Sequence, residues 1–184
     1  MTQKPIQTPL KNSKKGFLHI YTGEGKGKTT AALGLALRAM GAGWRVFFAQ
    51  FLKQGAFSEI KALKHFEGQC TVRQYGTGRF IRGKPTASDI KQAQEGLQEI
   101  LKTAQTQAYD LYILDEINVA IHFGLLTLND ILLFLEQMPT NVEIVMTGRW
   151  AQKELMERAD VVTEMKCLAH YYEQGVTARE GIEK

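Results

Sequence analysis

The sequence predicts an α/β fold in which a mostly parallel sheet carries helices on both of its faces. Short apolar segments of strand length alternate with longer helical segments along nearly the whole chain, and this alternation is typical of parallel sheets. The length of 184 residues suits one domain with a sizeable core. We therefore expect a single domain over residues 16–184, preceded by a flexible basic arm over residues 1–15.

Six segments are expected to be strands, because each is short, mostly apolar and bounded by turn-forming residues. They are Gly16–Tyr21, Arg45–Phe51, Thr71–Tyr75, Tyr109–Leu114, Val142–Thr147 and Val161–Met165. Five segments are expected to be helices, with Ser88 and Thr127 as N-caps of the third and the fourth. They are Thr29–Met40, Phe57–Glu67, Ser88 to about Gln107, Thr127–Gln137 and Gln152–Arg158. In such sheets ligands bind beyond the carboxyl ends of the strands, so we expect the site in the loops there.

Composition narrows the class of protein. The apolar fraction is 44% and the charged fraction is 23%, which is ordinary for a soluble globular domain. No apolar run approaches the roughly 20 residues that span a bilayer, and residues 1–15 lack the apolar centre of a secretory signal. Cys70 and Cys167 stand far apart and outside any metal-ligand spacing, as reduced thiols of a cytoplasmic protein would. No aromatic-rich basic stripe follows the basic arm, so we expect neither nucleic acid nor a membrane as a partner.

A glycine-rich loop follows the expected first strand: Thr22-Gly23-Glu24-Gly25-Lys26-Gly27-Lys28-Thr29-Thr30. Its end, Gly27-Lys28-Thr29, matches the close of the Walker A motif, although Thr22 stands where that motif usually has its first glycine. Gly25 and Gly27 allow the backbone to curl, so that its N–H groups and the N-terminus of the next helix form an anion cradle. A plain turn would not require the Lys-Thr pair. We therefore expect a phosphate site and a P-loop NTPase-like, RecA-like sheet.

The expected nucleotide-binding residues belong to this loop and to the helix after it. They are Gly23, Glu24, Gly25, Lys26, Gly27, Lys28, Thr29, Thr30 and Arg38. Lys28 is expected to place its charge on the phosphates, and the Thr29 hydroxyl to coordinate Mg²⁺ or Mn²⁺. Lys26 either reaches a phosphate or is a solvated surface lysine. Arg38 is either a surface residue or lies at the rim of the nucleotide.

Two carboxylates end the expected fourth strand, where Asp115-Glu116 follows an apolar run as in a Walker B motif. Hard cations prefer oxygen ligands, so these carboxylates can bind a metal ion directly or through water. Glu116 can instead orient an attacking water, and the pair can alternatively cap the next helix. Arg149 follows the expected fifth strand on the same edge, where its planar fork can clamp phosphate oxygens or form a structural ion pair. Lys28, Glu116 and Arg149 are the expected catalytic residues.

Together these motifs resemble the P-loop type of ATP:corrinoid adenosyltransferase of cobalamin biosynthesis. The matching segments span residues 16–183: Tyr21–Ala32, Gln50-Phe51-Leu52-Lys53, Leu114-Asp115-Glu116, Thr147-Gly148-Arg149, Gly175-Val176 and Gly181-Ile182-Glu183. The resemblance implies transfer of the 5′-deoxyadenosyl group of ATP to the reduced cobalt of a corrinoid, with triphosphate as leaving group. It implies that Lys28, Arg149 and the loop backbone hold the triphosphate. It also implies that Thr29 and Glu116 hold Mg²⁺, with Asp115 behind them.

The resemblance further implies a cytoplasmic homodimer that takes ATP and a reduced corrinoid as substrates and electrons from a donor such as flavodoxin or reduced flavin. Family members often carry two aromatic residues in the loop after the third strand, where this chain has Arg79 and Ile81 around Phe80. Either Phe80 contacts the corrinoid in a shifted register, or the corrinoid is held differently. The alternative activities are those of a P-loop ATPase or nucleotide kinase and of a nucleotide sensor without turnover. Product analysis distinguishes triphosphate from ADP and phosphate.

Overall fold

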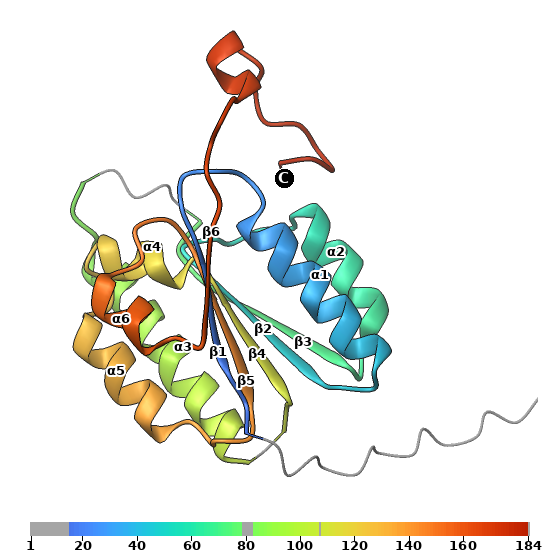
Figure 1. Ribbon diagram of the computed structural model, residues 1–184, viewed down its shortest axis with the longest axis vertical. Helices are drawn as coiled ribbons and strands as arrows, with labels where there is room; N and C mark the ends of the chain where they lie inside the picture. The colour runs from blue at the N-terminus through green and yellow to red at the C-terminus, as the bar shows by residue number, and fades with distance from the viewer. Residues whose placement is uncertain (1–14, 79–82, 107, 184) are drawn as a thin grey trace, which may run out of the picture.

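Six short apolar segments pair side by side into one sheet in the computed structural model, which describes residues 15–78, 83–106 and 108–183 (Figure 1). The strands are β1 (Leu18–Thr22), β2 (Val46–Phe51), β3 (Cys70–Tyr75), β4 (Leu111–Asp115), β5 (Glu143–Thr147) and β6 (Val161–Glu164). Their order across the sheet is β3-β2-β4-β5-β1-β6, and every neighbouring pair is parallel. The predicted parallel sheet is thus confirmed.

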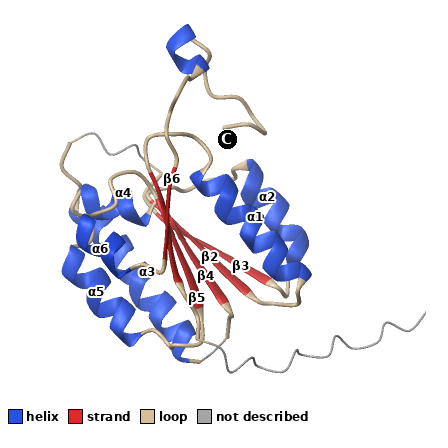
Figure 2. Ribbon diagram, viewed as in Figure 1, coloured by secondary structure: helices blue, strands red, loops and turns tan. Residues whose placement is uncertain are grey.

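Helices cover both faces of this sheet, as the sequence predicted (Figure 2). One face carries α1 (Lys28–Gly41), α2 (Ser58–Leu63) and a short 3-10 helix, η1 (Lys64–Phe66). The other face carries α3 (Ala87–Gln105), α4 (Ile117–His122), α5 (Leu128–Gln137) and α6 (Lys153–Arg158). A second 3-10 helix, η2 (Tyr171–Gln174), belongs to the C-terminal segment, which extends beyond the sheet. Within the described residues, no helix combines the length and the apolar character that a membrane crossing requires.

The core consists of two apolar clusters, one on each face of the sheet, because successive residues of a strand point to opposite faces. Phe48 and Ile113 are buried beneath α1 and α2, whereas Phe47 and Tyr112 are buried on the other face. Each fully buried side chain of this size contributes about 1.5–3 kcal/mol to stability. The small residues on the inner side of α1, such as Ala36, let that helix approach the sheet closely. This packing fixes the start of α1 at the carboxyl edge of the sheet.

Three local predictions require correction. The N-cap of α3 is Thr86 and not Ser88: the Thr86 side chain accepts from the backbone of Asp89, whose carboxylate accepts from the Thr86 N–H. The helix expected over Phe57–Glu67 is divided into α2 and η1. Helix α4 was not predicted, since it follows β4 directly and has only six residues. The Thr127 cap of α5 is confirmed. The arm over residues 1–15 lies outside the described residues, except for its last residue.

Candidate functional site

The glycine-rich loop after β1 wraps around the ammonium group of Lys28. Gly27 has a φ of 117° and Gly23 a φ of 95°, left-handed values that glycine adopts without a steric penalty. The Lys28 Nζ donates to the carbonyl oxygens of Gly23, at 2.7 Å, and Gly25, at 2.6 Å. Burial lowers the pKa of Lys28, and the nearby Arg149 lowers it further. A negatively charged phosphate oxygen is a better partner for this cation than two neutral carbonyls. A bound phosphate can therefore replace the carbonyl oxygens of Gly23 and Gly25 as the partner of Lys28.

Asp115 is completely buried at the end of β4 and accepts hydrogen bonds from four side chains. Its Oδ1 accepts from the hydroxyls of Thr29, at 2.8 Å, and Thr147, at 2.7 Å. Its Oδ2 accepts from the Gln50 amide, at 3.1 Å, and from Lys53, at 3.4 Å. Buried charges persist when they are paired and hydrogen-bonded in this way. Asp115 therefore orients the Thr29 hydroxyl and has both of its own oxygens engaged.

Glu116 differs from its neighbour, because its carboxylate is partly exposed and makes no capping hydrogen bond. Its φ is 62°, a rare left-handed value for a side chain of this size, and its N–H donates to the Thr147 hydroxyl at 3.0 Å. The alternative in which this carboxylate caps α4 is thus not adopted. Burial raises the pKa of Glu116, Asp115 raises it further, and Lys53, whose ammonium lies 3.8 Å away, opposes both. Glu116 is the carboxylate that offers oxygens at this edge.

The residues fit a hard divalent cation. Thr29 donates its hydroxyl hydrogen to Asp115, which leaves its lone pairs available, and Glu116 supplies carboxylate oxygens from the neighbouring loop. Among the described residues, no group of three or more His, Cys, Asp or Glu side chains is placed to hold a metal ion. A cation here would therefore draw its remaining ligands from water and phosphate oxygens, as Mg²⁺ does in nucleotide sites.

Arg149 reaches the phosphate loop from the end of β5. Its Nη1 lies 3.1 Å from a carboxylate oxygen of Glu24, and both side chains are about half exposed. A surface ion pair of this kind contributes little to stability. Arg149 can therefore reorient its guanidinium group toward another anion with little loss of stability. The structure thus brings Lys28, Thr29, Glu116 and Arg149 to one edge, as predicted.

Lys26 faces a segment that the sequence did not place near it. We call residues 165–183 the C-terminal tail; Figure 1 shows it rising from β6 and turning back over the loop. Lys26 Nζ donates to Glu183, at 2.7 Å, to the Tyr171 hydroxyl, at 3.1 Å, and to the Ile182 carbonyl, at 3.0 Å. The Gly25 N–H donates to the Met165 carbonyl at 2.6 Å. The tail is therefore fastened to the loop at both of its ends.

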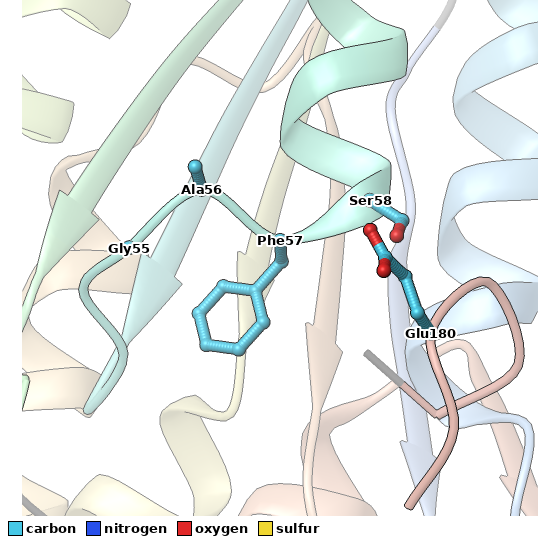
Figure 3. A pocket seen from close by; sticks show the side chains of 5 residues that line it. All are labelled: Gly55, Ala56, Phe57, Ser58 and Glu180. Carbon is cyan, nitrogen blue, oxygen red and sulfur yellow. The ribbon is translucent and has the colours of Figure 1, made fainter.

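A cavity of about 220 Å³ lies beside the loop after β2. Its lining residues are Gly55, Ala56, Phe57, Ser58 and Glu180. Figure 3 shows Gly55, Ala56 and Phe57 on one side, and the side chain of Ser58 beside the carboxylate of Glu180, which belongs to the tail. The Lys53 ammonium lies 6.0 Å from the centre of the Phe57 ring, so the cavity adjoins the lysine that pairs with Asp115. The tail closes one side of this cavity.

Three of the predicted nucleotide-binding residues are not part of this cluster as described. Arg38 lies ten residues after Lys28 in α1, about 15 Å along the helix, and is exposed near Tyr21 of β1. Thr30 is exposed in the first turn of α1. Phe80 lies outside the described residues. A contact between Arg38 and the nucleotide stays a prediction.

Comparison with known proteins decides the family. A family profile described as ATP:corrinoid adenosyltransferase BtuR/CobO/CobP matches residues 14–183. The chain belongs to this family. The enzyme is 31% identical over 176 residues to a corrinoid adenosyltransferase of Sinorhizobium sp, with 94% of this chain and 82% of that protein covered. It is 32% identical over 171 residues to that of Pseudomonas aeruginosa, with coverage of 92% and 84%. For the Escherichia coli K12 protein the identity is 30% over 170 residues, with coverage of 92% and 86%.

Comparison of solved structures agrees on the fold. The flagellar accessory protein FlaH from Methanocaldococcus jannaschii matches with a TM-score of 0.57 at 15% identity, over 82% of this chain and 71% of that one. At this identity the likeness shows the fold alone, and it agrees with the predicted α/β arrangement of a parallel sheet between helices. The predicted activity is confirmed by the family: the adenosyltransferase transfers the adenosyl group of ATP to the cobalt of a corrinoid.

The structure adds residues for which no role was predicted. Gln50, Lys53 and Thr147 hold Asp115 from β2, the loop after β2, and β5. The available signal was that each stands at or just past the carboxyl end of an expected strand, where side chains of parallel strands meet. Tyr171 and Glu183 of the tail had no such signal, because their partner Lys26 lies about 150 residues earlier in the chain.

Proposed function

We propose that this adenosyltransferase holds the triphosphate of ATP in the loop Gly23–Gly27, with Lys28 and Arg149 on its oxygens. Thr29 and Glu116 hold Mg²⁺ or Mn²⁺, and Asp115 orients Thr29 from behind. The observation that carries this proposal is the bond from Thr29 to the buried Asp115, which joins the phosphate loop to the Walker B strand. The Thr29 lone pairs and the partly exposed Glu116 carboxylate lie on the same edge, which supports this assignment.

The chemistry needs no nucleophile from the protein. The cobalt(I) of the corrinoid carries the electron pair that attacks the ribose 5′-carbon of ATP. A cobalt–carbon bond forms while the bond from that carbon to the triphosphate oxygen breaks, and its electron pair leaves with the triphosphate. The bound Mg²⁺ would supply charge neutralisation for the leaving group.

The chain contributes alignment and charge. Lys28 and Arg149 stabilise the negative charge that grows on the triphosphate, and such preorganised groups typically account for 10²–10³-fold of rate. The loop amides fix the nucleotide, so that its 5′-carbon stays within reach of the second substrate. Glu116 holds the cation, and no water needs activation in this reaction. We therefore favour the role of cation ligand for Glu116 over that of water positioning.

Three further proposals follow from the family and from features of this chain. The cobalt must be reduced to cobalt(I) before it attacks, so the enzyme works with an electron donor such as flavodoxin or reduced flavin. We propose a cytoplasmic location, in keeping with unpaired Cys70 and Cys167.

We also propose a homodimer. It is supported by β6, an edge strand whose Val161 and Val162 are 40% and 44% exposed, since exposed edges of sheets usually need cover.

Product analysis tests the proposed reaction. The enzyme is mixed with Mg-ATP and chemically reduced cobalamin, and the absorption spectrum is followed for a light-sensitive alkyl-cobalt species while the released phosphates are separated. We expect the alkyl-cobalt species and triphosphate in equal amounts, and neither when Mg²⁺ is chelated. Release of ADP and phosphate without alkylation would instead indicate the alternative, a P-loop ATPase or kinase.

A further inference from the structure

Trp150 has an unusual backbone conformation for a bulky residue. Its φ is 58°, in the left-handed region that large side chains rarely occupy. Its indole is nevertheless 41% exposed, so the conformation does not serve to bury the ring in the core. Backbone strain of this kind persists where the surroundings enforce it, often at functional sites.

Two other rings meet the indole. We call His122, Phe123 and Trp150 the aromatic platform. The centres of the His122 and Trp150 rings are 4.2 Å apart with planes at 30°, and the Phe123 ring meets the indole edge-on at 5.9 Å. His122 is exposed and Phe123 partly buried. The platform therefore has a packed base and an open aromatic surface.

The loop that carries Trp150 is fixed on both sides. The Asn118 amide of α4 donates to the Gly148 carbonyl at 3.2 Å, and the Ala151 N–H donates to the Thr22 hydroxyl at 3.3 Å. A side chain on Gly148 would come within 3.1 Å of Val119, so loop and helix are in direct contact. The ring is thus held in place before any ligand arrives, which lowers the entropy lost on binding.

The platform lies beside the nucleotide site and not within it. Trp150 directly follows Arg149, which reaches Glu24, and α4 begins directly after Glu116. The loop Gly23–Gly27 and the start of α1 lie over one face of the sheet, whereas α4 and α6 lie over the other (Figure 1). A ligand on the platform would therefore approach the triphosphate site from the α4 side of the edge.

From these observations we infer that the aromatic platform binds the corrinoid substrate, with Trp150 against the flat macrocycle or its attached base. The inference rests on the proposed position of the triphosphate. A corrin is broad, flat and largely apolar on its faces, and the open surface formed by Trp150 and His122 over Phe123 suits it. An adenine base is smaller and is usually enclosed in a slot that buries most of its surface. Trp150 is thus assigned to substrate specificity rather than to the chemical step.

Fluorescence of single-tryptophan variants tests the contact. The chain has two tryptophans, and Trp44 precedes β2 at the opposite end of the sheet. Trp44→Phe leaves Trp150 as the reporter, and Trp150→Phe leaves Trp44. On titration with hydroxocobalamin in the presence of Mg-ATP, we expect strong saturable quenching in Trp44→Phe and markedly weaker quenching in Trp150→Phe, because energy transfer to the bound corrinoid falls steeply with distance. Equal quenching in both variants would overturn the inference, as would quenching of Trp150 by Mg-ATP alone, which would indicate base stacking.

Kinetics provide a second test. Trp150→Ala is expected to raise the KM for reduced cobalamin about tenfold, as loss of one aromatic contact implies, with the KM for ATP within twofold of the original. Trp150→Phe should restore most of the loss. Leu133→Ala, which removes a side chain that is 47% exposed on α5, is the matched surface control and should change neither constant. Equal increases in both constants, or no increase, would contradict the inference.

Trp150→Gly separates binding from folding, because glycine accepts the left-handed backbone without strain. It should raise the KM for cobalamin as Trp150→Ala does while unfolding at a higher urea concentration than Trp150→Ala. If the KM for cobalamin instead follows stability across these variants, the ring is structural and the inference fails. If the unmutated enzyme makes no alkyl-cobalt product, the proposed function itself is contradicted. If the unmutated enzyme is active and the Trp150 variants keep its KM for cobalamin, this inference alone is contradicted.

Discussion

The phosphate site and the C-terminal tail touch the same loop but are held by different kinds of interaction. Asp115 is 0% exposed and bonded to four side chains, whereas Leu168 and Tyr172 of the tail are 94% and 72% exposed. Buried networks rigidify a site, while exposed ion pairs contribute little and are screened by salt. The proposed triphosphate site is therefore preformed, whereas the tail is the part able to move away from it.

The largest effect is expected from Lys28→Ala. This substitution removes the ammonium group from the proposed phosphate site and does not alter the contacts of the tail. Lys28 provides the cation at the centre of the loop, and we expect adenosylation to fall by at least about 10³-fold. Far-ultraviolet circular dichroism should be unchanged, because the apolar core does not depend on this side chain. The measurement is the rate of alkyl-cobalt formation at saturating ATP.

Lys26→Ala is the matched control, since it removes a lysine two residues away that faces the tail. It should slow the reaction only a few-fold. If Lys28→Ala retained turnover at saturating ATP, or if the two variants were equally impaired, the contrast between site and tail would not hold.

Thiol labelling extends the contrast, with a rate ratio of at least about 100 expected between the two cysteines. Cys167 lies exposed in the tail, whereas Cys70 is buried where β3 begins. Burial raises the pKa of Cys70 to about 11, so roughly 0.1% of it is thiolate at pH 8, and the thiolate is the reactive form. A chromogenic disulfide reagent should therefore show one fast and one slow equivalent.

Labelling of Cys70 should accelerate as the pH rises toward 11, because the thiolate fraction increases tenfold for each pH unit below the pKa. Cys167→Ser is the control and should remove only the fast phase. Two equally fast thiols in the original protein would mean that the β3 end of the core opens as readily as the tail.

Much of the fold was predictable, because local patterns determine it. All six strands begin and end within two residues of their expected bounds, since each is a short apolar run between turn signals. The Walker loop was equally clear, because its spacing is local. The wrong cap of α3 had a local signal as well: Thr86 with Asp89 three residues later forms a capping box, and Ser88 was the weaker choice.

The division of labour between the two Walker B carboxylates was not predictable. It depends on Gln50, Lys53 and Thr147, which reach Asp115 only because β2 and β5 flank β4 in the sheet. Contacts of the tail are even less local. No pattern in the sequence states that Lys26 meets Glu183, because a lysine and a glutamate that far apart can pair with many others.

Gly25→Ala tests where the tail is fastened, and we expect about a tenfold loss of activity. A side chain at this position would lie 2.7 Å from the Met165 carbonyl and 2.8 Å from the Lys166 carbonyl, closer than real contacts allow. The tail must then shift away from the loop. Limited trypsin digestion should cleave at Lys166 several times faster than in the original protein.

Gly34→Ala is the matched control, because nothing lies within 4 Å of a side chain there. Gly34 is inside α1, where alanine is favoured by about 0.5–1 kcal/mol. This variant should unfold at a higher urea concentration and keep its activity and its digestion rate. Unchanged digestion in Gly25→Ala would show that the tail does not depend on this close approach.

The smallest effect is expected from Glu183→Gln, which weakens only the far end of the tail. Hydrogen bonds from Arg179, Lys26 and Tyr171 hold the pKa of Glu183 well below its usual range. A carboxyl with a depressed pKa contributes to attachment at any pH above its unfolded value, and the contribution is lost only as the pH falls below that value toward the native one. The attachment should therefore persist unchanged between pH 8 and pH 5.

At low salt Glu183→Gln should speed trypsin cleavage at Arg179 about two- to fivefold. In 1 M salt the difference should vanish, because the Debye length falls to about 3 Å. The urea midpoint of the whole protein should not move, since the pair is exposed and the core is untouched. A shifted midpoint would place the tail within the cooperative unit of the domain, and a salt-independent effect would assign its attachment to packing. In either case the tail would be a rigid part of the domain. The contrast between a movable tail and a preformed phosphate site would then disappear.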